Sequence, residues 1–188
     1  MFAAIAERLP ADARILSFGC STGEELASLR RLMPAARLTG VEINPRARRL
    51  AARRMGGDPL ANVFATLPDG PFDAALALAV LQREPHRIAD EGIVDLARTY
   101  PFARFDEGLG ALVDRIVPDG LLAIFHAQYR VEDSSAADCL VAVPGAPMMD
   151  GPLFDPGSRR YAPTPVAASL FVKGTERCAA IAPASANS

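Results

Sequence analysis

The residues that most clearly suggest ligand binding in this sequence form a short glycine-containing stretch, Gly19 to Glu25, which reads GCSTGEE. It follows an apolar segment, Arg14–Phe18, that predicts a buried strand. Glu42 ends the next apolar segment, 19 positions after Gly23. In an open α/β sheet the ligand crevice lies outside the carboxyl ends of the strands, where such a loop and such an acidic residue meet. A carboxylate at this spacing can accept hydrogen bonds from both ribose hydroxyls, so the pattern predicts a ligand that contains a nucleoside.

The charge of the loop indicates which nucleoside ligand it accepts. A dinucleotide places its pyrophosphate at a helix N-terminus, and the usual loop for it is G-x-G-x-x-G. This loop is G-x-x-x-G, and Glu24 and Glu25 would face the two phosphates. S-adenosylmethionine has no phosphate and carries a net positive charge. The acidic helix start therefore favours S-adenosylmethionine over NAD.

A second group of reactive side chains follows the segments predicted as the fourth and fifth strands. After the fourth come Gln82, Arg83, Glu84 and His86, and after the fifth come His126, Gln128, Tyr129 and Arg130. Methyl transfer to a hydroxyl or ammonium group needs a proton acceptor, and the 2 histidines of the chain both fall at these edges. We expect His126, Tyr129 and His86 to be the catalytic residues.

Each of these side chains also has a structural interpretation. A histidine at a strand end often only makes structural hydrogen bonds, and Tyr129 could pack under the last strands. Arg83 and Arg130 are either surface charges or ligands for an acidic acceptor, and the sequence leaves both open.

The rest of the sequence supplies the elements that would position these groups. Strands are expected at 14–18, 36–43, 62–66, 72–80, 121–125, 139–143 and 167–172, and helices at 1–9, between Thr22 and Pro34, at 45–55 and at 106–117. A less regular segment, 82–105, is placed either to cover the acceptor or to pad the sheet edge. Alternating strands and helices followed by a closing strand pair predict a doubly wound α/β sheet.

Composition limits the class of protein. The chain has 188 residues, is 50% hydrophobic and has a net charge of −2, which fits one well-buried core and gives no reason to expect nucleic acid as a partner. The longest apolar run, 74–81, is far shorter than the roughly 20 residues of a membrane span. The 3 cysteines are widely spaced and form no CxxC pair, so we expect a cytoplasmic protein and no metal site.

Four segments together resemble class I S-adenosylmethionine-dependent methyltransferases. They are ILSFGCSTGEE, LTGVEINPRA, GPFDAALALAVLQ and RIVPDGLLAIFHAQY, and they occur in the family's order over roughly Arg14 to Tyr129. The resemblance implies a doubly wound, mostly parallel seven-stranded sheet with helices on both faces and a closing antiparallel strand. It implies one donor-binding domain over residues 1–175, and we expect 176–188 to be a disordered tail.

The resemblance also assigns the donor site residue by residue. It implies that S-adenosylmethionine is bound by Gly19, Cys20, Ser21, Gly23, Glu25, Glu42, Ile43 and Ala79. The family usually has an acidic residue after the third strand that holds adenine, and this sequence has no clear equivalent, although Asn62, Thr66 and Asp69 are nearby. The Asp/Asn-Pro-Pro-Tyr/Phe motif of enzymes that methylate exocyclic amines is also absent, which weighs against nucleic-acid adenine as the acceptor.

The sequence leaves three alternative functions to be distinguished. The first is an S-adenosylmethionine-dependent methyltransferase that acts on a small molecule. The second is a non-catalytic S-adenosylmethionine-binding regulatory or partner subunit, which the missing adenine carboxylate and the lack of a decisive base make credible. The third is an NAD-type dehydrogenase domain, which the acidic helix start disfavours. The oligomeric state and the identity of the acceptor cannot be predicted.

Overall fold

The structure is a computed structural model that describes residues 1–175, so the predicted tail 176–188 lies outside the described residues. The strands are β1 (Arg14–Phe18), β2 (Arg37–Val41), β3 (Ala61–Phe64), β4 (Phe72–Leu78), β5 (Ile116–Phe125), β6 (Leu140–Ala142) and β7 (Leu170–Lys173). The helices are α1 (Phe2–Ala6), α2 (Glu24–Leu32), α3 (Pro45–Arg54), α4 (Pro85–Asp90) and α5 (Phe102–Val113), with 3₁₀ turns η1 (Val131–Asp133) and η2 (Ala137–Cys139).

All seven strands form one twisted sheet in the order β3-β2-β1-β4-β5-β7-β6. The first five strands are parallel, and β7 is antiparallel to both β5 and β6. The predicted fold class, a mostly parallel seven-stranded sheet with a closing antiparallel strand, is confirmed. The order reverses between β1 and β4, where a doubly wound sheet opens a crevice at the carboxyl ends of its strands.

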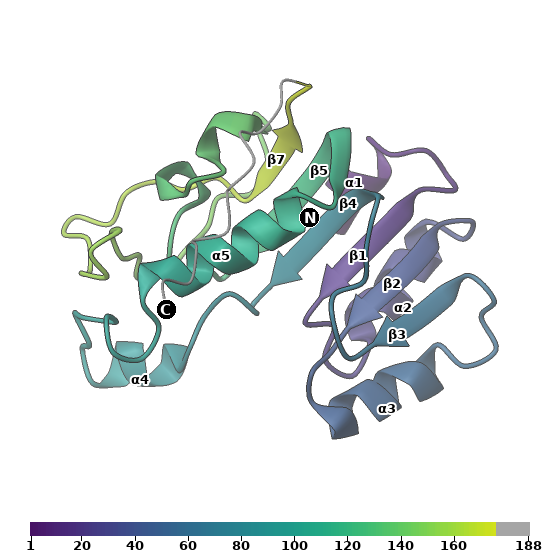
Figure 1. Cartoon of the computed structure of the whole chain (residues 1–188), viewed down its shortest axis with the longest axis horizontal. Helices are drawn as coiled ribbons and strands as arrows, with labels where there is room; N and C mark the ends of the chain where they lie inside the picture. Colours follow the sequence, from purple (N-terminus) through teal and green to yellow (C-terminus); the bar gives the residue numbers. More distant parts are fainter. Residues whose placement is uncertain (176–188) are drawn as a thin grey trace, which may run out of the picture.

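Helices cover both faces of the sheet. In β4, Ala74 and Leu76 belong to the apolar cluster under α1, α2 and α3, whereas Ala75 and Ala77 belong to the cluster under α4 and α5. This double burial explains why β4 is a continuous apolar run, because a strand covered on both faces has no side for polar residues. Figure 1 shows α5 lying across one face of the sheet.

The helix starts that border the crevice follow from local sequence. Asn44 caps α3, because its side-chain oxygen accepts hydrogen bonds from the backbone N–H groups of Arg46 at 2.9 Å and Ala47 at 3.4 Å, and Pro45 follows as the first helical residue. The cap of α2 is Gly23, with φ +86° and no side-chain cap hydrogen bond. Glu24 and Glu25 at its start and Arg30 and Arg31 at its end both suit the helix dipole.

The predicted bounds of α5 and β5 need correction. The helix begins at Phe102 and not at Asp106, because the hydroxyl of Ser158, from a distant loop, accepts the Phe102 N–H at 3.1 Å. β5 begins at Ile116 and not at Leu121. Residues 118–120, where the sequence PDG indicates a turn, lie inside the strand where its register against β4 shifts.

Candidate active site

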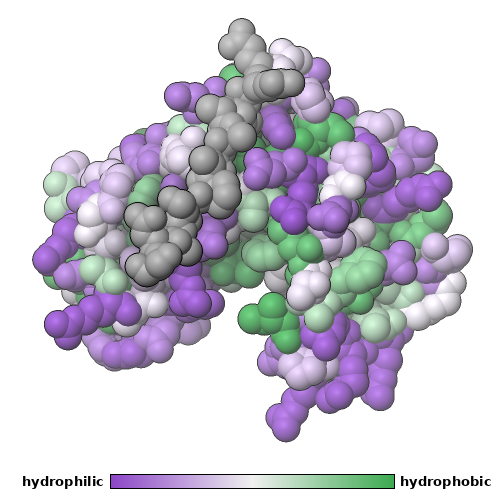
Figure 2. All heavy atoms as spheres, viewed as in Figure 1, coloured by the Kyte–Doolittle hydropathy of each residue, from purple (hydrophilic) through white to green (hydrophobic). Residues whose placement is uncertain are grey.

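A cavity of about 450 Å³ opens at the carboxyl ends of β1, β2 and β4, and Figure 2 shows the surface hollowed between the part that carries α4 and the part that carries α3. We call the part of the cavity beside these strand ends its first half. It is lined by Phe18, Gly19, Ser21, Val41, Glu42, Ile43, Ala79 and Val80. Its second half is lined by Leu81, Gln82, Arg83, Tyr100, Arg104 and Gly108. The cavity therefore joins the first glycine loop to the segment that runs into α5.

Glu42 is the best-oriented polar group of the first half. The backbone N–H of Ser21 donates to Glu42 Oε2 at 3.0 Å, and the backbone N–H of Asn44 donates to Oε1 at 2.7 Å. Each carboxylate oxygen is thus held by one backbone donor and keeps capacity for a further hydrogen bond. Ile43 follows with 79% of its side chain exposed, as an apolar surface beside this carboxylate.

The first glycine loop is fixed against the neighbouring strand ends. The N–H groups of Gly19 and Cys20 both donate to the carbonyl of Val41, at 2.8 and 2.9 Å. Gly19 has φ +75°, and a Cβ there would lie 2.4 Å from Val80 Cγ2. The loop therefore needs glycine at this position both for its backbone conformation and for the close approach of the segment after β4.

Three non-glycine residues at strand ends have a left-handed backbone. They are Ser21 with φ +48° after β1, Ala79 with φ +58° after β4 and His126 with φ +52° after β5. This region is uncommon for residues with a Cβ and is concentrated at functional sites. The backbone turns sharply at three neighbouring strand ends, and two of these residues, Ser21 and Ala79, line the cavity.

The two glutamates of the loop do not both face a ligand. Glu24 is exposed and forms an ion pair with Arg54 at 2.6 Å, and the hydroxyl of Thr22 together with this ion pair lowers its pKa to about 2. Glu25 is half-buried behind the loop, and the burial of its carboxyl raises its pKa to about 7, against the opposing effect of the Ser17 hydroxyl. The predicted repulsion of a pyrophosphate is therefore weaker than the sequence indicates.

The side chains of Ser17 and Glu25 meet behind the loop, and their hydrogen bonding is incomplete. Among residues 1–175, Ser17 Oγ and Glu25 Oε1 are buried side-chain atoms without a hydrogen-bond partner of normal geometry. Cys20 and Gly23 also lie behind the cavity, and the thiol of Cys20 is buried against Gly40. Burial raises the Cys20 pKa to about 11. Donor contact by Cys20, Gly23 and Glu25 stays a prediction, and none of these three residues lines the cavity.

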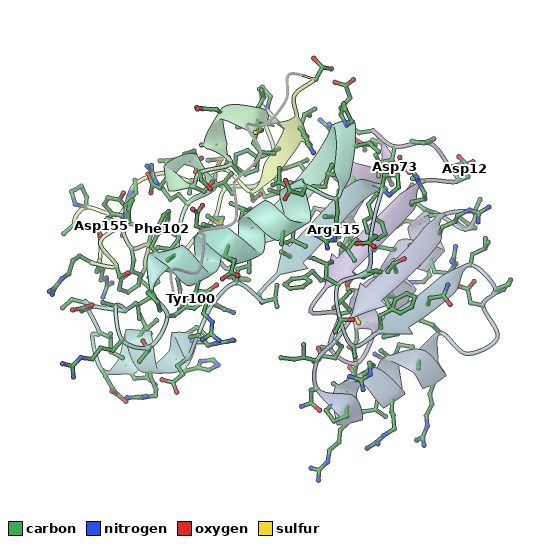
Figure 3. The ribbon with its side chains drawn as sticks, in the orientation of Figure 1. Asp12, Asp73, Tyr100, Phe102, Arg115 and Asp155 are labelled. Atoms are coloured by element: carbon green, nitrogen blue, oxygen red, sulfur yellow. The ribbon has the colours of Figure 1, made fainter. Side chains whose placement is uncertain are left out.

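Residues that follow β5 form hydrogen bonds to the backbone of residues that line the second half of the cavity. The side chain of Gln128, which is 3% exposed, accepts the backbone N–H of Arg83 at 2.9 Å and donates to the Arg83 carbonyl at 2.6 Å. The fully buried Tyr129 donates its hydroxyl to the carbonyl of Tyr100 at 2.5 Å. Figure 3 shows Tyr100 beside the first turn of α5. Gln128 and Tyr129 therefore position Arg83 and Tyr100.

The three residues predicted to be catalytic are not brought together at the cavity. His126 lines a separate cavity of about 90 Å³, where its Nδ1 lies 3.4 Å from an oxygen of Asp150. His86 is exposed on α4 and lines neither cavity. The hydroxyl of Tyr129 is already bonded inside the core. Catalysis by these residues stays a prediction, without support from this geometry.

Two polar residues that line the cavity were not predicted from the sequence. Tyr100 and Arg104 lie in the irregular segment whose two alternative roles the sequence leaves open, and both line the cavity. The only indication of them is the aromatic and basic composition of TYPFAR. Near the third strand, Asn62 lines a different cavity and Asp69 is exposed beside Arg115 at 3.6 Å, so neither replaces the missing adenine carboxylate.

Comparison with known proteins identifies the fold. Residues 16–91 match the family model described as a methyltransferase domain. No curated protein matches the sequence significantly. The N-methyltransferase NodS from Bradyrhizobium japonicum WM9 is 16% identical with a TM-score of 0.58, over 92% of this chain and 92% of that chain. At this identity the likeness shows a shared fold.

Two further structures are similar over part of their length. The sugar N-methyltransferase KedS8 from Streptoalloteichus sp ATCC 53650 is 20% identical with a TM-score of 0.47, over 80% of this chain and 53% of that chain. The [4+2]-cyclase SpnF is 23% identical with a TM-score of 0.48, over 65% of this chain. The chain spans 42% of the length of that cyclase. No helix among residues 1–175 combines the length and the apolar character needed to cross a membrane.

Proposed function

We propose, from the premise that residues 16–91 form a methyltransferase domain of the class I S-adenosylmethionine-dependent type, that the protein transfers a methyl group from S-adenosylmethionine to a small-molecule acceptor. The observation that carries the proposal is the Glu42 carboxylate, held at the rim of the cavity by the N–H groups of Ser21 and Asn44. All three residues lie inside the matched segment.

The residues of the first half fit such a donor. Glu42 offers two oriented acceptors to a ribose diol, and the exposed Ile43 offers an apolar surface to the base beside it. The Glu25 oxygen Oε1 is buried and Glu25 does not line the cavity, so a contact between Glu25 and the donor's ammonium group stays a prediction. When bound, S-adenosylmethionine supplies an activated methyl group on a sulfonium sulfur.

The second half of the cavity would hold the acceptor. Of the six residues that line it, none is a carboxylate or a histidine, and burial raises the pKa of Tyr100 to about 12, so its hydroxyl stays protonated at neutral pH. The acceptor's nucleophile therefore loses its proton to solvent or arrives without one. The contribution of the chain is to hold donor and acceptor in line, which can supply a large share of the rate.

The experiment that tests this proposal is calorimetry on the purified chain. S-adenosylmethionine and S-adenosylhomocysteine should each bind with one site, and NAD should show no measurable binding at similar concentrations. Binding of NAD without binding of either methyl-donor compound would overturn the proposal. Turnover is tested separately, because the six residues that line the second half of the cavity include no carboxylate or histidine. Slow formation of S-adenosylhomocysteine with a metabolite mixture distinguishes an enzyme from a donor-binding partner subunit.

Three further expectations stay proposals. We expect the donor-binding unit to be the single domain of residues 1–175, the acceptor to be small, and the protein to lie in the cytoplasm. The volume of about 450 Å³ supports a small acceptor, because the donor occupies the same cavity.

A further inference from the structure

Two arginines, Arg83 and Arg104, line the second half of the cavity. Arg83 comes from the segment after β4, and Arg104 comes from the first turn of α5. Both guanidinium groups act electrostatically on the hydroxyl of Tyr100, whose pKa they lower against the larger effect of burial. The two positive charges therefore converge on one place, the cavity wall around Tyr100.

Neither charge is paired with a carboxylate among residues 1–175. Eight other arginines of this part of the chain do form such an ion pair, namely Arg8, Arg14, Arg30, Arg54, Arg87, Arg115, Arg130 and Arg159. The acidic residues close to these arginines in the sequence have other partners. Glu84 binds Arg87 at 2.6 Å, and Asp106 accepts the N–H of Ser135 at 2.8 Å.

A buried side chain fixes the position of the Arg83 backbone. The side chain of Gln128 holds its backbone on both sides, at 2.9 and 2.6 Å. Its guanidinium lies over the ring of Tyr100, 5.7 Å from the centroid, and that residue is in turn held by the buried Tyr129 hydroxyl. One Arg83 N–H donates to the carbonyl of Gln82 at 3.4 Å, and a guanidinium has five N–H donors, so others remain for a ligand. Arg83 is exposed, but its backbone is fixed by Gln128 and its side chain lies over Tyr100.

We propose that the acceptor carries an anionic group, a carboxylate or a phosphate, and that Arg83 and Arg104 bind it. The proposal rests on the proposed function, because it places the anion beside a bound methyl donor. Guanidinium groups bind the oxygens of either anion through paired, charge-assisted hydrogen bonds. The cavity also separates its charges, with Glu42 at the donor end and the two arginines at the acceptor end.

The test measures binding of two simple anions to the whole chain. Inorganic phosphate and malonate are titrated by calorimetry, with and without saturating S-adenosylhomocysteine, at low ionic strength because salt screens exposed charges. The parent should bind at least one of the two anions saturably, and the preferred anion identifies the group on the acceptor. Arg83→Gln and Arg104→Gln should each weaken that binding roughly tenfold, and the double variant should abolish it.

The controls separate this proposal from the proposed function. Arg31→Gln makes the same charge change at the far end of α2, and it should bind the anion as the parent does. Arg104→Lys should keep part of the affinity, because the charge remains. All variants should bind S-adenosylhomocysteine normally, since both arginines lie outside the donor half. Absence of anion binding to the parent, or equal binding by parent and double variant, would overturn the proposal. Failure to bind S-adenosylhomocysteine with anion binding intact would instead count against the methyltransferase function.

Discussion

Glu42 is the side chain on which donor affinity should depend most. Two charge-assisted hydrogen bonds to a ribose diol, about 1.5–3 kcal/mol each, are lost in Glu42→Ala, and competition by water reduces the net effect. We expect affinity for S-adenosylhomocysteine, measured by calorimetry, to fall about 30- to 150-fold. Thermal stability without ligand should change little. Asp69→Ala, which removes a fully exposed carboxylate outside the cavity, is the control and should bind normally. Normal binding by Glu42→Ala would remove the basis for placing the donor here.

Glu25 should make stability fall as pH rises towards neutrality. Its carboxyl titrates near 4.5 when unfolded and at about 7 in the folded protein, where burial penalises the charge. Between these values the folded state binds more protons, so the free energy of unfolding decreases from about pH 4.5 to about pH 7 and then levels off. We expect a loss of about 1–3 kcal/mol from this group.

The measurement is urea denaturation at pH 5.5 and pH 8, on the parent and on Glu25→Gln. The variant keeps the shape of the side chain but cannot ionise, so it should lose less stability than the parent over this interval. Both proteins contain the same histidines, so the difference between them reports Glu25 alone. Parallel pH profiles would show that this carboxyl is ionised in the folded protein throughout.

At the scale of elements, the contact between the loop after β1 and the end of β4 shapes the cavity. Gly19→Ala imposes a left-handed backbone on alanine and drives its Cβ into Val80, 2.4 Å away. Gly57→Ala imposes the same kind of backbone strain, with φ +86°, but meets nothing within 4 Å. We expect Gly57→Ala to cost about 1–2 kcal/mol in urea denaturation and Gly19→Ala about 2–4 kcal/mol. Only Gly19→Ala should weaken donor binding. Equal losses in both variants would mean that Val80 moves aside freely.

The elements that local sequence specifies could be predicted, and those that depend on distant contacts could not. β1, β2, β4 and α3 follow from apolar runs and the Asn44-Pro45 start, which need no tertiary information. The start of α5 depends on Ser158, and its end is bordered by the Lys173 ammonium, which donates to the carbonyls of Val113 at 2.7 Å and Ile116 at 2.8 Å. Both partners are far along the chain, so the helix bounds are a tertiary property.

The candidate site divides in the same way. The positions of Gly19, Ser21, Glu42, Ile43 and Ala79 at the cavity follow from the order of strands, because residues at the ends of adjacent parallel strands must meet. The acceptor half could not be placed, because Tyr100 and Arg104 reach the cavity only through the position of α5. The buried hydrogen bonds of Gln128 and Tyr129 could not be predicted from the sequence either, since a side chain at a strand end can face either the ligand or the core.

At the scale of the whole molecule, a ligand in this cavity should stabilise the entire fold. The cavity is bounded by β1 and β2 on one side and by the segment after β4 with α5 on the other, so a ligand bound in it would contact both parts of the molecule. A ligand that binds only the folded state at 100 times its Kd adds about 2.7 kcal/mol to the free energy of unfolding.

For a chain of this length each kcal/mol moves Tm by roughly 2–4 °C, so we expect saturating S-adenosylhomocysteine to raise Tm by roughly 5–11 °C in thermal unfolding followed by circular dichroism. NAD at the same concentration should leave Tm unchanged, because the loop after β1 lacks the glycine spacing that receives a pyrophosphate. Glu42→Ala, with its weaker donor binding, should show a smaller shift at the same ligand concentration, while its Tm without ligand matches the parent. A rise of Tm with NAD that equals the rise with S-adenosylhomocysteine would mean that the cavity recognises the shared adenosine and not the methyl donor.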